Sequence, residues 1–188
     1  MNVLIIGSGG REHAICVSCK KSTEVKQIFC MPGNAGTDQI SKNVLIDLDN
    51  FKEIVKFVKK NKIDLVIVGP EKPLVDGIVD FLEKNKIKVF GPNKIASKLE
   101  GSKIFTKKLC EKYKIPTANF GIFNTSQEAN DFIENCKLPI VVKADGLASG
   151  KGVYICNKKE DALIAIKEIF NGKFGLARPI DIFTFSTP

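Results

Sequence analysis

The chain has 188 residues, enough for one large domain or two small ones with separate cores, and 44% of them are hydrophobic, as in ordinary folded proteins. No apolar stretch approaches the roughly 18 residues of a membrane span, and a strand-like run starts directly after Met1, so we expect a cytoplasmic protein without a membrane partner. Only Arg11 and Arg178 are arginines among the 29 basic residues that produce the net charge of +8. Because dispersed lysines typically form a solvated surface, this charge does not indicate a nucleic-acid partner.

The cysteines lie mostly within periodic apolar segments, where a free thiol behaves as a small hydrophobic side chain. We therefore expect no disulfide bonds. Cys16 and Cys19 form a single Cys-x-x-Cys pair, and no second pair completes a zinc site. We interpret them as core or surface residues rather than as metal or redox groups. The six are Cys16, Cys19, Cys30, Cys110, Cys136 and Cys156.

The first hundred residues alternate short β-branched runs with amphipathic helices. Strands are expected at residues 3–6, 25–30, 44–46, 64–68 and 88–90. One helix is indicated by the spacing of apolar residues over 51–58, and Pro73 is placed as the first residue of another that runs through Leu82. The alternation predicts an α/β fold with an open, largely parallel sheet, covered on both faces because its strands are so apolar.

Four turns rich in glycine, proline and asparagine follow the expected strands, at residues 7–10, 31–34, 69–71 and 91–93. Because such turns share the carboxyl edge of a parallel sheet, where ligands bind, we expect them to form one site. The first turn enters a helix, whose N–H groups and dipole favour an anion. Arg11 adds a guanidinium suited to phosphate.

A dinucleotide-binding domain is the obvious alternative for this first half. Glu12, however, stands where the third glycine of the GxGxxG fingerprint belongs, and no acid follows the second strand to hold a ribose. These two departures disfavour a nicotinamide-dependent oxidoreductase. His13, the only histidine, is placed just inside the first helix, where a structural or substrate-positioning role is favoured over a general base.

After residue 93 helix signals dominate before a second α/β unit begins. Asn93 and Ser102 can cap helices over 94–99 and through Lys112. Strands are then expected at 118–123, 140–143 and 153–156, with helices capped by Ser126 and starting at Glu160. We place the domain boundary near residue 100.

The segment 139–155 sets Lys143 on an apolar strand, then three spaced glycines and Lys151, then a second apolar strand. Glycines let backbone N–H groups approach an anion closely, so the pattern predicts a β-hairpin flap over phosphates. A Walker A loop is excluded because the spacing is one residue short and Gly152 stands where the hydroxyl should be. A glycine-rich hairpin without a ligand is the remaining alternative.

Five segments in this order resemble the phosphoribosylamine-glycine ligase (glycinamide ribonucleotide synthetase) family of the ATP-grasp superfamily. They are GSGGREHA (7–14), PGNAGT (32–37), VGPEKPLVDGIVD (68–80), LEGSK (99–103) and VKADGLASGKGV (142–153). The resemblance implies a Rossmann-like domain at residues 1–100 that binds 5-phosphoribosylamine, then an incomplete ATP-grasp domain at residues 101–175. It implies ATP-dependent ligation of glycine to 5-phosphoribosylamine through glycyl phosphate, with Mg²⁺ or Mn²⁺.

The resemblance also implies two sets of binding residues, and it assigns no catalytic residue or metal ligand to this chain. Contacts to ATP are expected from Lys103, Lys143, Gly146, Gly150, Lys151 and Gly152. A phosphoribosylamine pocket is expected to be lined by Gly9, Gly10, Arg11, Glu12, Asn34, Pro70 and Glu71.

The resemblance is incomplete at the carboxyl end. Family members are much longer, so the metal ligands are expected beyond Pro188, and residues 176–188 (LARPIDIFTFSTP) are expected to form a divergent, poorly anchored tail. The chain is therefore expected to be truncated and inactive alone, with a second polypeptide carrying the missing carboxyl-terminal domains as one hypothesis. A noncatalytic nucleotide- or sugar-phosphate-binding remnant is the alternative.

Overall fold

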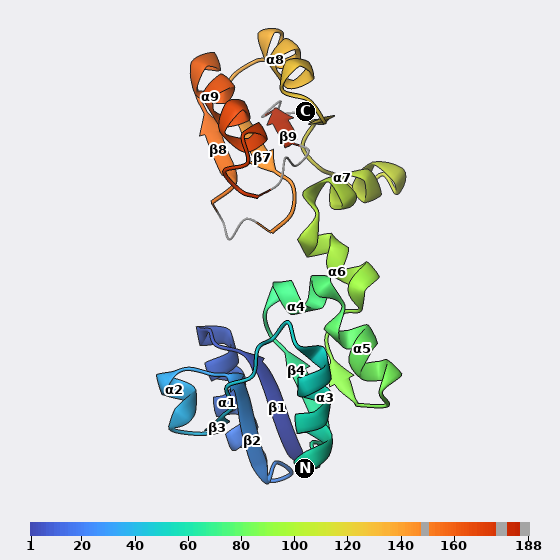
Figure 1. The fold of residues 1–188 in the computed structure, drawn as a ribbon. Helices are drawn as coiled ribbons and strands as arrows, with labels where there is room; N and C mark the ends of the chain where they lie inside the picture. The colour runs from blue at the N-terminus through green and yellow to red at the C-terminus, as the bar shows by residue number, and fades with distance from the viewer. Residues whose placement is uncertain (148–150, 176–179, 185–188) are drawn as a thin grey trace. The chain divides into compact units, whose positions relative to one another are not determined.

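A computed structural model describes residues 1–147, 151–175 and 180–184 of the chain (Figure 1). The chain divides into two compact units, residues 1–97 (unit 1) and residues 98–188 (unit 2). Among the described residues, no helix combines the length and the apolar composition that crossing a membrane would require.

Unit 1 contains a five-stranded sheet in the order β3-β2-β1-β4-β5, and every strand pair in it is parallel. The strands are β1 (Asn2–Gly7), β2 (Gln27–Pro32), β3 (Lys42–Asn43), β4 (Leu65–Val68) and β5 (Val89–Phe90). This confirms the predicted α/β fold. The chain moves outward from β1 to β3 and then returns to the other side of β1 at β4, so the topological switch point lies between β1 and β4.

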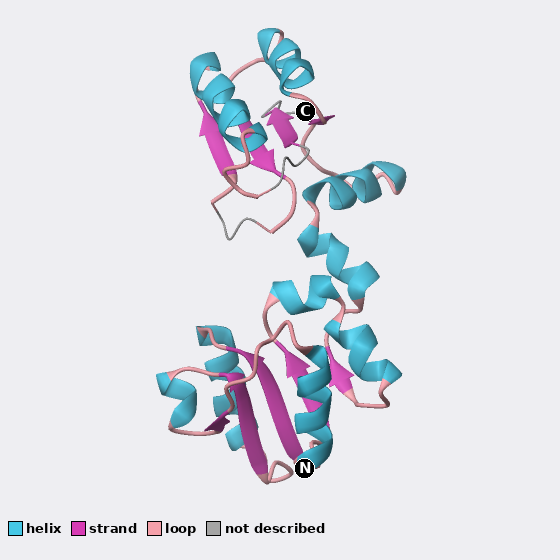
Figure 2. Ribbon diagram, in the orientation of Figure 1, coloured by secondary structure: helices cyan, strands magenta, loops and turns pink. Residues whose placement is uncertain are grey.

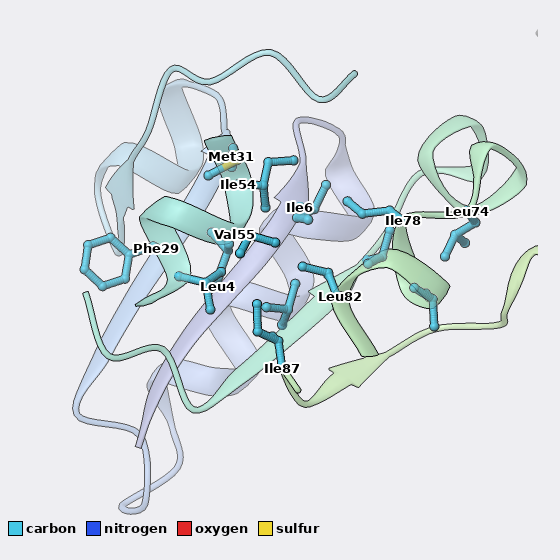
Figure 3. Packing of buried hydrophobic residues seen from close by; sticks show 14 residues of the cluster. Leu4, Ile6, Phe29, Met31, Ile54, Val55, Leu74, Ile78, Leu82 and Ile87 are labelled. Carbon is cyan, nitrogen blue, oxygen red and sulfur yellow. The ribbon is translucent and has the colours of Figure 1, made fainter. Parts of the chain in front are cut away.

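Helices cover both faces of this sheet, as its apolar strands predicted (Figure 2). They are α1 (Gly10–Lys20), α2 (Ala35–Asp38), α3 (Phe51–Lys60), α4 (Glu71–Asp76) and α5 (Ile78–Lys84). On one face, Leu4 and Ile6 pack with Ile54 of α3 and Leu82 of α5 (Figure 3). On the other, Val3 and Ile5 of β1 pack with Cys16 of α1. Alternate residues of a strand point to opposite faces, so β1 joins both cores.

Cysteines in unit 1 behave as core residues. All six cysteines of the chain are free, and Cys16 and Cys30 are fully buried in the same apolar cluster. Burial raises the pKa of Cys16 to about 12 and also raises that of Cys30, so both thiols stay protonated at neutral pH. A thiol in that state is a poor nucleophile or metal ligand, which agrees with the interpretation of Cys16 as a core residue.

Two elements of unit 1 differ from the prediction. The third strand lies at Lys42–Asn43 rather than at 44–46, because the Asn43 side chain bonds to Thr37 Oγ1 at 2.8 Å and to the Asn34 carbonyl at 2.8 Å, which holds the chain beside β2 at that point. The helix expected from Pro73 to Leu82 is instead two helices, α4 and α5. Gly77 separates them at φ +98°, a left-handed conformation that glycine adopts at little cost.

Unit 2 contains an antiparallel sheet in the order β6-β9-β7-β8. Its strands are β6 (Phe120–Phe123), β7 (Ile140–Ala144), β8 (Val153–Cys156) and β9 (Ile180–Thr184). Its helices are α7 (Lys103–Lys112), α8 (Ser126–Glu134) and α9 (Lys159–Phe170), while α6 (Lys94–Gly101) runs across the division between the units. Helices α8 and α9 bury Ile133 and Ile166 against Val142 of β7. Thr125, not Ser126, caps α8 by accepting from the Glu128 N–H.

The expectation of a poorly anchored tail is wrong for residues 180–184. This segment is strand β9, which pairs with β6 on one side and with β7 on the other, and Ile180 and Ile182 are fully buried. The prediction gave weight to the missing acidic residues of the family strand and too little to the alternation of Ile180 and Ile182, which is typical of a half-buried strand. The other tail residues, 176–179 and 185–188, lie outside the described part of the chain.

Candidate functional site

The carboxyl edge of the unit 1 sheet brings three of the predicted turns together. Asn34 links the turn after β2 to the turn after β1: its side-chain oxygen accepts from Gly36 N at 2.8 Å and Thr37 N at 3.0 Å, while its amide nitrogen donates to the Ser8 carbonyl at 2.8 Å. One side chain thus caps α2 and fixes the neighbouring turn. Through these bonds Asn34 fixes the position of the turn after β2 relative to the turn after β1.

Arg11 and Glu71 connect the turn after β1 to the turn after β4. Arg11 Nη2 lies 2.8 Å from Glu71 Oε1, and the two side chains are 67% and 39% exposed. Glu71 follows Pro70 at the start of α4, and a bond from its own backbone N–H, together with Arg11, lowers the pKa of its carboxyl below the usual range. Exposed ion pairs contribute only about 0–1 kcal/mol, so a ligand can compete for Arg11 at small cost.

Glu12 lies beneath these turns and is only 3% exposed. Its Oε2 accepts from Gly9 N at 2.7 Å, and its Oε1 is buried without a hydrogen-bond partner. A Cβ at Gly7 would lie 2.5 Å from Glu12 Cγ, and one at Gly69 would lie 2.1 Å from Oε1. Glycines on β1 and after β4 therefore make room for this carboxylate at the switch point.

The start of α1 is open to a ligand at Gly10, because no atom beyond its chain neighbours and the backbone of α1 itself lies within 4 Å of the position that a Cβ would take there. His13 lies one turn further on and faces α2: a Cβ at Gly36 would be 2.9 Å from its ring. This contact agrees with the structural role favoured for His13.

In unit 2 the predicted phosphate-binding residues gather where α7 begins and β7 ends. Ser102 caps α7, as predicted, by accepting from Phe105 N at 3.1 Å. Lys103 Nζ donates to the Gly146 carbonyl at 2.9 Å. Lys143 is on β7, and the Gly152 carbonyl accepts from Ala144 N at 2.9 Å, so β7 and β8 form the predicted hairpin. Lys151 precedes β8, and Gly150 lies outside the described residues.

Asp145 is a residue of this site that the sequence analysis missed. Its carboxylate accepts from Ser102 Oγ at 3.0 and 3.1 Å and from Ile104 N at 3.2 Å. It therefore ties the N-terminus of α7 to the end of β7, and so places Lys103 beside Gly146. The only signal in the sequence was an acid directly after a strand, within VKADG, and its partner lies 43 residues away.

We expect Asp145→Ala to destabilise unit 2 by about 1–3 kcal/mol, because it removes an acceptor from both the Ser102 hydroxyl and an N–H of the first turn of α7. Chemical denaturation followed by circular dichroism measures this. Asp131→Ala is the matched control, since Asp131 is exposed on α8 and its carboxylate bonds only to Gln127 among the contacts described. Equal effects of the two substitutions would contradict the assigned role of Asp145.

The comparisons with known proteins cover both units. The model of the family "Phosphoribosylglycinamide synthetase, N domain" matches residues 1–100, and that of "Phosphoribosylglycinamide synthetase, ATP-grasp (A) domain" matches residues 101–182. The chain belongs to the phosphoribosylglycinamide synthetase family. The second match continues through residue 182, whereas the sequence analysis expected the ATP-grasp segment to end at residue 175.

Individual relatives agree with this assignment. The chain is 45% identical over 177 residues to the phosphoribosylamine–glycine ligase of Clostridium acetobutylicum, covering 92% of this chain and 42% of the relative. It is 50% identical over 155 residues to the enzyme of the same name from Caldanaerobacter subterraneus, covering 82% and 37%. The chain thus spans less than half the length of the curated relatives that it matches.

Solved structures show the same likeness. The phosphoribosylamine–glycine ligase of Thermotoga maritima aligns with a TM-score of 0.79 at 33% identity, over 100% of this chain and 44% of that one. The N5-carboxyaminoimidazole ribonucleotide synthetase of Thermus thermophilus aligns with a TM-score of 0.72 over 100% and 47%, but at 16% identity it supports the fold alone. Together these confirm the predicted Rossmann-like unit followed by an ATP-grasp segment.

Proposed function

We propose that this chain is the part of a phosphoribosylamine–glycine ligase that binds 5-phosphoribosylamine and the phosphates of ATP. The complete reaction joins glycine to 5-phosphoribosylamine and gives glycinamide ribonucleotide, ADP and phosphate. The observation that carries the proposal is the match of both synthetase domains over residues 1–182. We place the functional division near residue 100, with the sugar-phosphate site before it and the ATP site after it.

The unit 1 edge has the chemistry that phosphoribosylamine requires. This substrate carries a phosphate at one end and an amine at the other, so its site needs both cationic and anionic groups. Arg11 and the open start of α1 at Gly10 suit the phosphate. The Glu12 and Glu71 carboxylates accept hydrogen bonds from amine or hydroxyl groups. The remaining members of the proposed pocket are Gly9, Asn34 and Pro70.

The unit 2 cluster has the chemistry that ATP phosphates require. Lys103, Lys143 and Lys151 supply positive charge, and Gly146, Gly150 and Gly152 let backbone N–H groups approach the phosphate oxygens. The glycine carboxylate attacks the γ-phosphorus, and ADP leaves to give glycyl phosphate. The phosphoribosylamine nitrogen then attacks the glycyl carbonyl carbon, and inorganic phosphate leaves. Lysine charges near the phosphates stabilise the negative charge that develops in the first step.

The described residues do not provide the divalent metal site that this reaction uses. Mg²⁺, or Mn²⁺, would neutralise charge on the transferred phosphoryl group. Among residues 1–147, 151–175 and 180–184, no group of three or more His, Cys, Asp or Glu side chains could hold a metal ion. We propose that the metal ligands belong to the part of the ligase that this chain does not span, since the chain covers 42% of its Clostridium acetobutylicum relative, and that a second polypeptide carries them.

A noncatalytic nucleotide- or sugar-phosphate-binding protein is the second candidate, because each unit carries a group suited to phosphate, Arg11 in unit 1 and Lys103 in unit 2. Mixing the chain with a polypeptide that carries the rest of that relative distinguishes the two. Formation of glycinamide ribonucleotide only when both polypeptides are present supports the ligase. Binding of ribose 5-phosphate without turnover by a stable mixed complex supports the second candidate.

Arg11→Ala is expected to weaken binding of ribose 5-phosphate by about 10- to 100-fold, the worth of a charge-assisted hydrogen bond to phosphate. Isothermal titration calorimetry on the full chain measures the affinity. Lys20→Ala is the matched control, because it removes one exposed positive charge from the other end of α1. If Arg11→Ala binds as tightly as Lys20→Ala, Arg11 is not part of the phosphate site.

A further inference from the structure

Glu12 combines burial, an unpartnered oxygen and an unusual position in the first turn. It is 97% buried, as only 3% of the residue is exposed, and its Oε1 has no hydrogen-bond partner. It also lies at the third-glycine position of a GxGxxG-like turn, and it occupies the space beside Gly7, Gly9 and Gly69. A buried carboxylate without full hydrogen bonding is costly, so it calls for an explanation beyond packing.

The space that Glu12 fills has a specific use in dinucleotide-binding domains. There the second glycine of the turn lets the backbone approach a pyrophosphate, and the third lets the helix pack closely on the strand. In this chain the second glycine is Gly9, and its N–H is already bonded to Glu12 Oε2 at 2.7 Å. The Glu12 carboxylate therefore uses the backbone donor that a pyrophosphate would need.

The charge of Glu12 disfavours binding of a pyrophosphate, as does its bond to Gly9. A negative group at the start of α1 is itself favoured by the helix dipole, so the helix end is partly neutralised before any ligand arrives. A second phosphate group brought beside it would be repelled by a like charge in a poorly solvated setting. A single phosphate can still bind on the open side, at Gly10 and Arg11.

We propose that Glu12 is a specificity-determining residue that limits this pocket to ligands with one phosphate group and rejects pyrophosphate-linked dinucleotides. The proposal rests on the proposed function, in which the sugar monophosphate binds at this edge. It explains how a Rossmann-like sheet with a glycine-rich first turn and an Arg11 guanidinium discriminates between a ribose monophosphate and NAD⁺, which present similar ribose and phosphate groups.

The test compares ribose 5-phosphate with NAD⁺ by calorimetric titration of the full chain and two variants. Glu12→Gln keeps the shape and removes the charge, and Glu12→Gly restores the GxGxxG spacing. We expect the affinity for NAD⁺ to rise about tenfold in Glu12→Gln, as loss of one nearby like charge predicts, and further in Glu12→Gly. Glu24→Gln is the control, since it removes an exposed carboxylate of unit 1 away from the turn.

The outcomes separate this inference from the proposed function. If both Glu12 variants are folded by circular dichroism and bind NAD⁺ no better than the unmodified chain, the inference is overturned. Should Glu12→Gly fail to fold, the isosteric Glu12→Gln alone decides it. If the unmodified chain does not bind ribose 5-phosphate while a Glu12 variant gains NAD⁺ binding, the proposed function fails and the role of Glu12 in excluding pyrophosphate stands.

Discussion

Replacing Ile182 by alanine is expected to destabilise unit 2 by about 2–5 kcal/mol, the usual cost of removing most of a fully buried isoleucine side chain. Ile182 lies on β9, the strand between β6 and β7, and packs into the cluster formed with α8 and α9. A substitution here opens a cavity against both neighbouring strands. Urea denaturation followed by circular dichroism measures the loss, and the transition of unit 1 is expected to stay in place.

Ile155→Ala is the matched control for this prediction. Ile155 is also an isoleucine of the unit 2 sheet, but it lies on the outer strand β8 and is 69% exposed. Exposed substitutions usually change stability by less than about 0.5 kcal/mol. A small effect of Ile182→Ala, similar to that of Ile155→Ala, would show that residues 180–184 are not part of the folded unit and would restore the idea of an unanchored tail.

Most of the fold could be predicted because its signals are local. Short apolar runs located the strands other than β3 and β9, and the alternation with helices predicted the parallel topology of unit 1. The errors arose where distant contacts decide. Asn43 holds β3 through bonds to Thr37 and Asn34. Strand β9 carried a local signal in the alternation of Ile180 and Ile182, but its place between β6 and β7 depends on strands far away in sequence. No short window of sequence contains such information.

The candidate site was predictable to the extent that topology alone determines it. Parallel strands end at one edge, which explains why Arg11, Asn34 and Glu71 come together from three turns as expected. The individual partners were not predictable. The carboxylate of Glu12, for example, is buried against Gly69, 57 residues away in sequence. The glycine of VGPEKP was read as part of a turn, whereas its missing side chain is what Glu12 requires.

The close contact between Gly69 and Glu12 predicts that Gly69→Ala destabilises the protein only while Glu12 is present. A Cβ at residue 69 would lie 2.1 Å from Glu12 Oε1 and 2.7 Å from Cγ and Cδ, and the bond from Gly9 N to Oε2 at 2.7 Å opposes movement of the carboxylate. Forcing an extra methyl group into packed space costs about 1–3 kcal/mol. Thermal and chemical denaturation of the full chain measure that loss.

The double substitution Glu12→Ala with Gly69→Ala tests whether the Glu12 side chain is the reason that residue 69 is glycine. In a Glu12→Ala background the side chain that meets the new methyl group is gone, so we expect Gly69→Ala to cost less than about 0.5 kcal/mol there, leaving a coupling energy of about 1–3 kcal/mol. Gly10→Ala is the control, because nothing lies within 4 Å of its Cβ position, and alanine in a helix is if anything more favourable than glycine. Equal costs of Gly69→Ala in the two backgrounds would mean that the glycine serves the backbone of the turn and not the buried carboxylate, and the switch point would then have to be explained without Glu12.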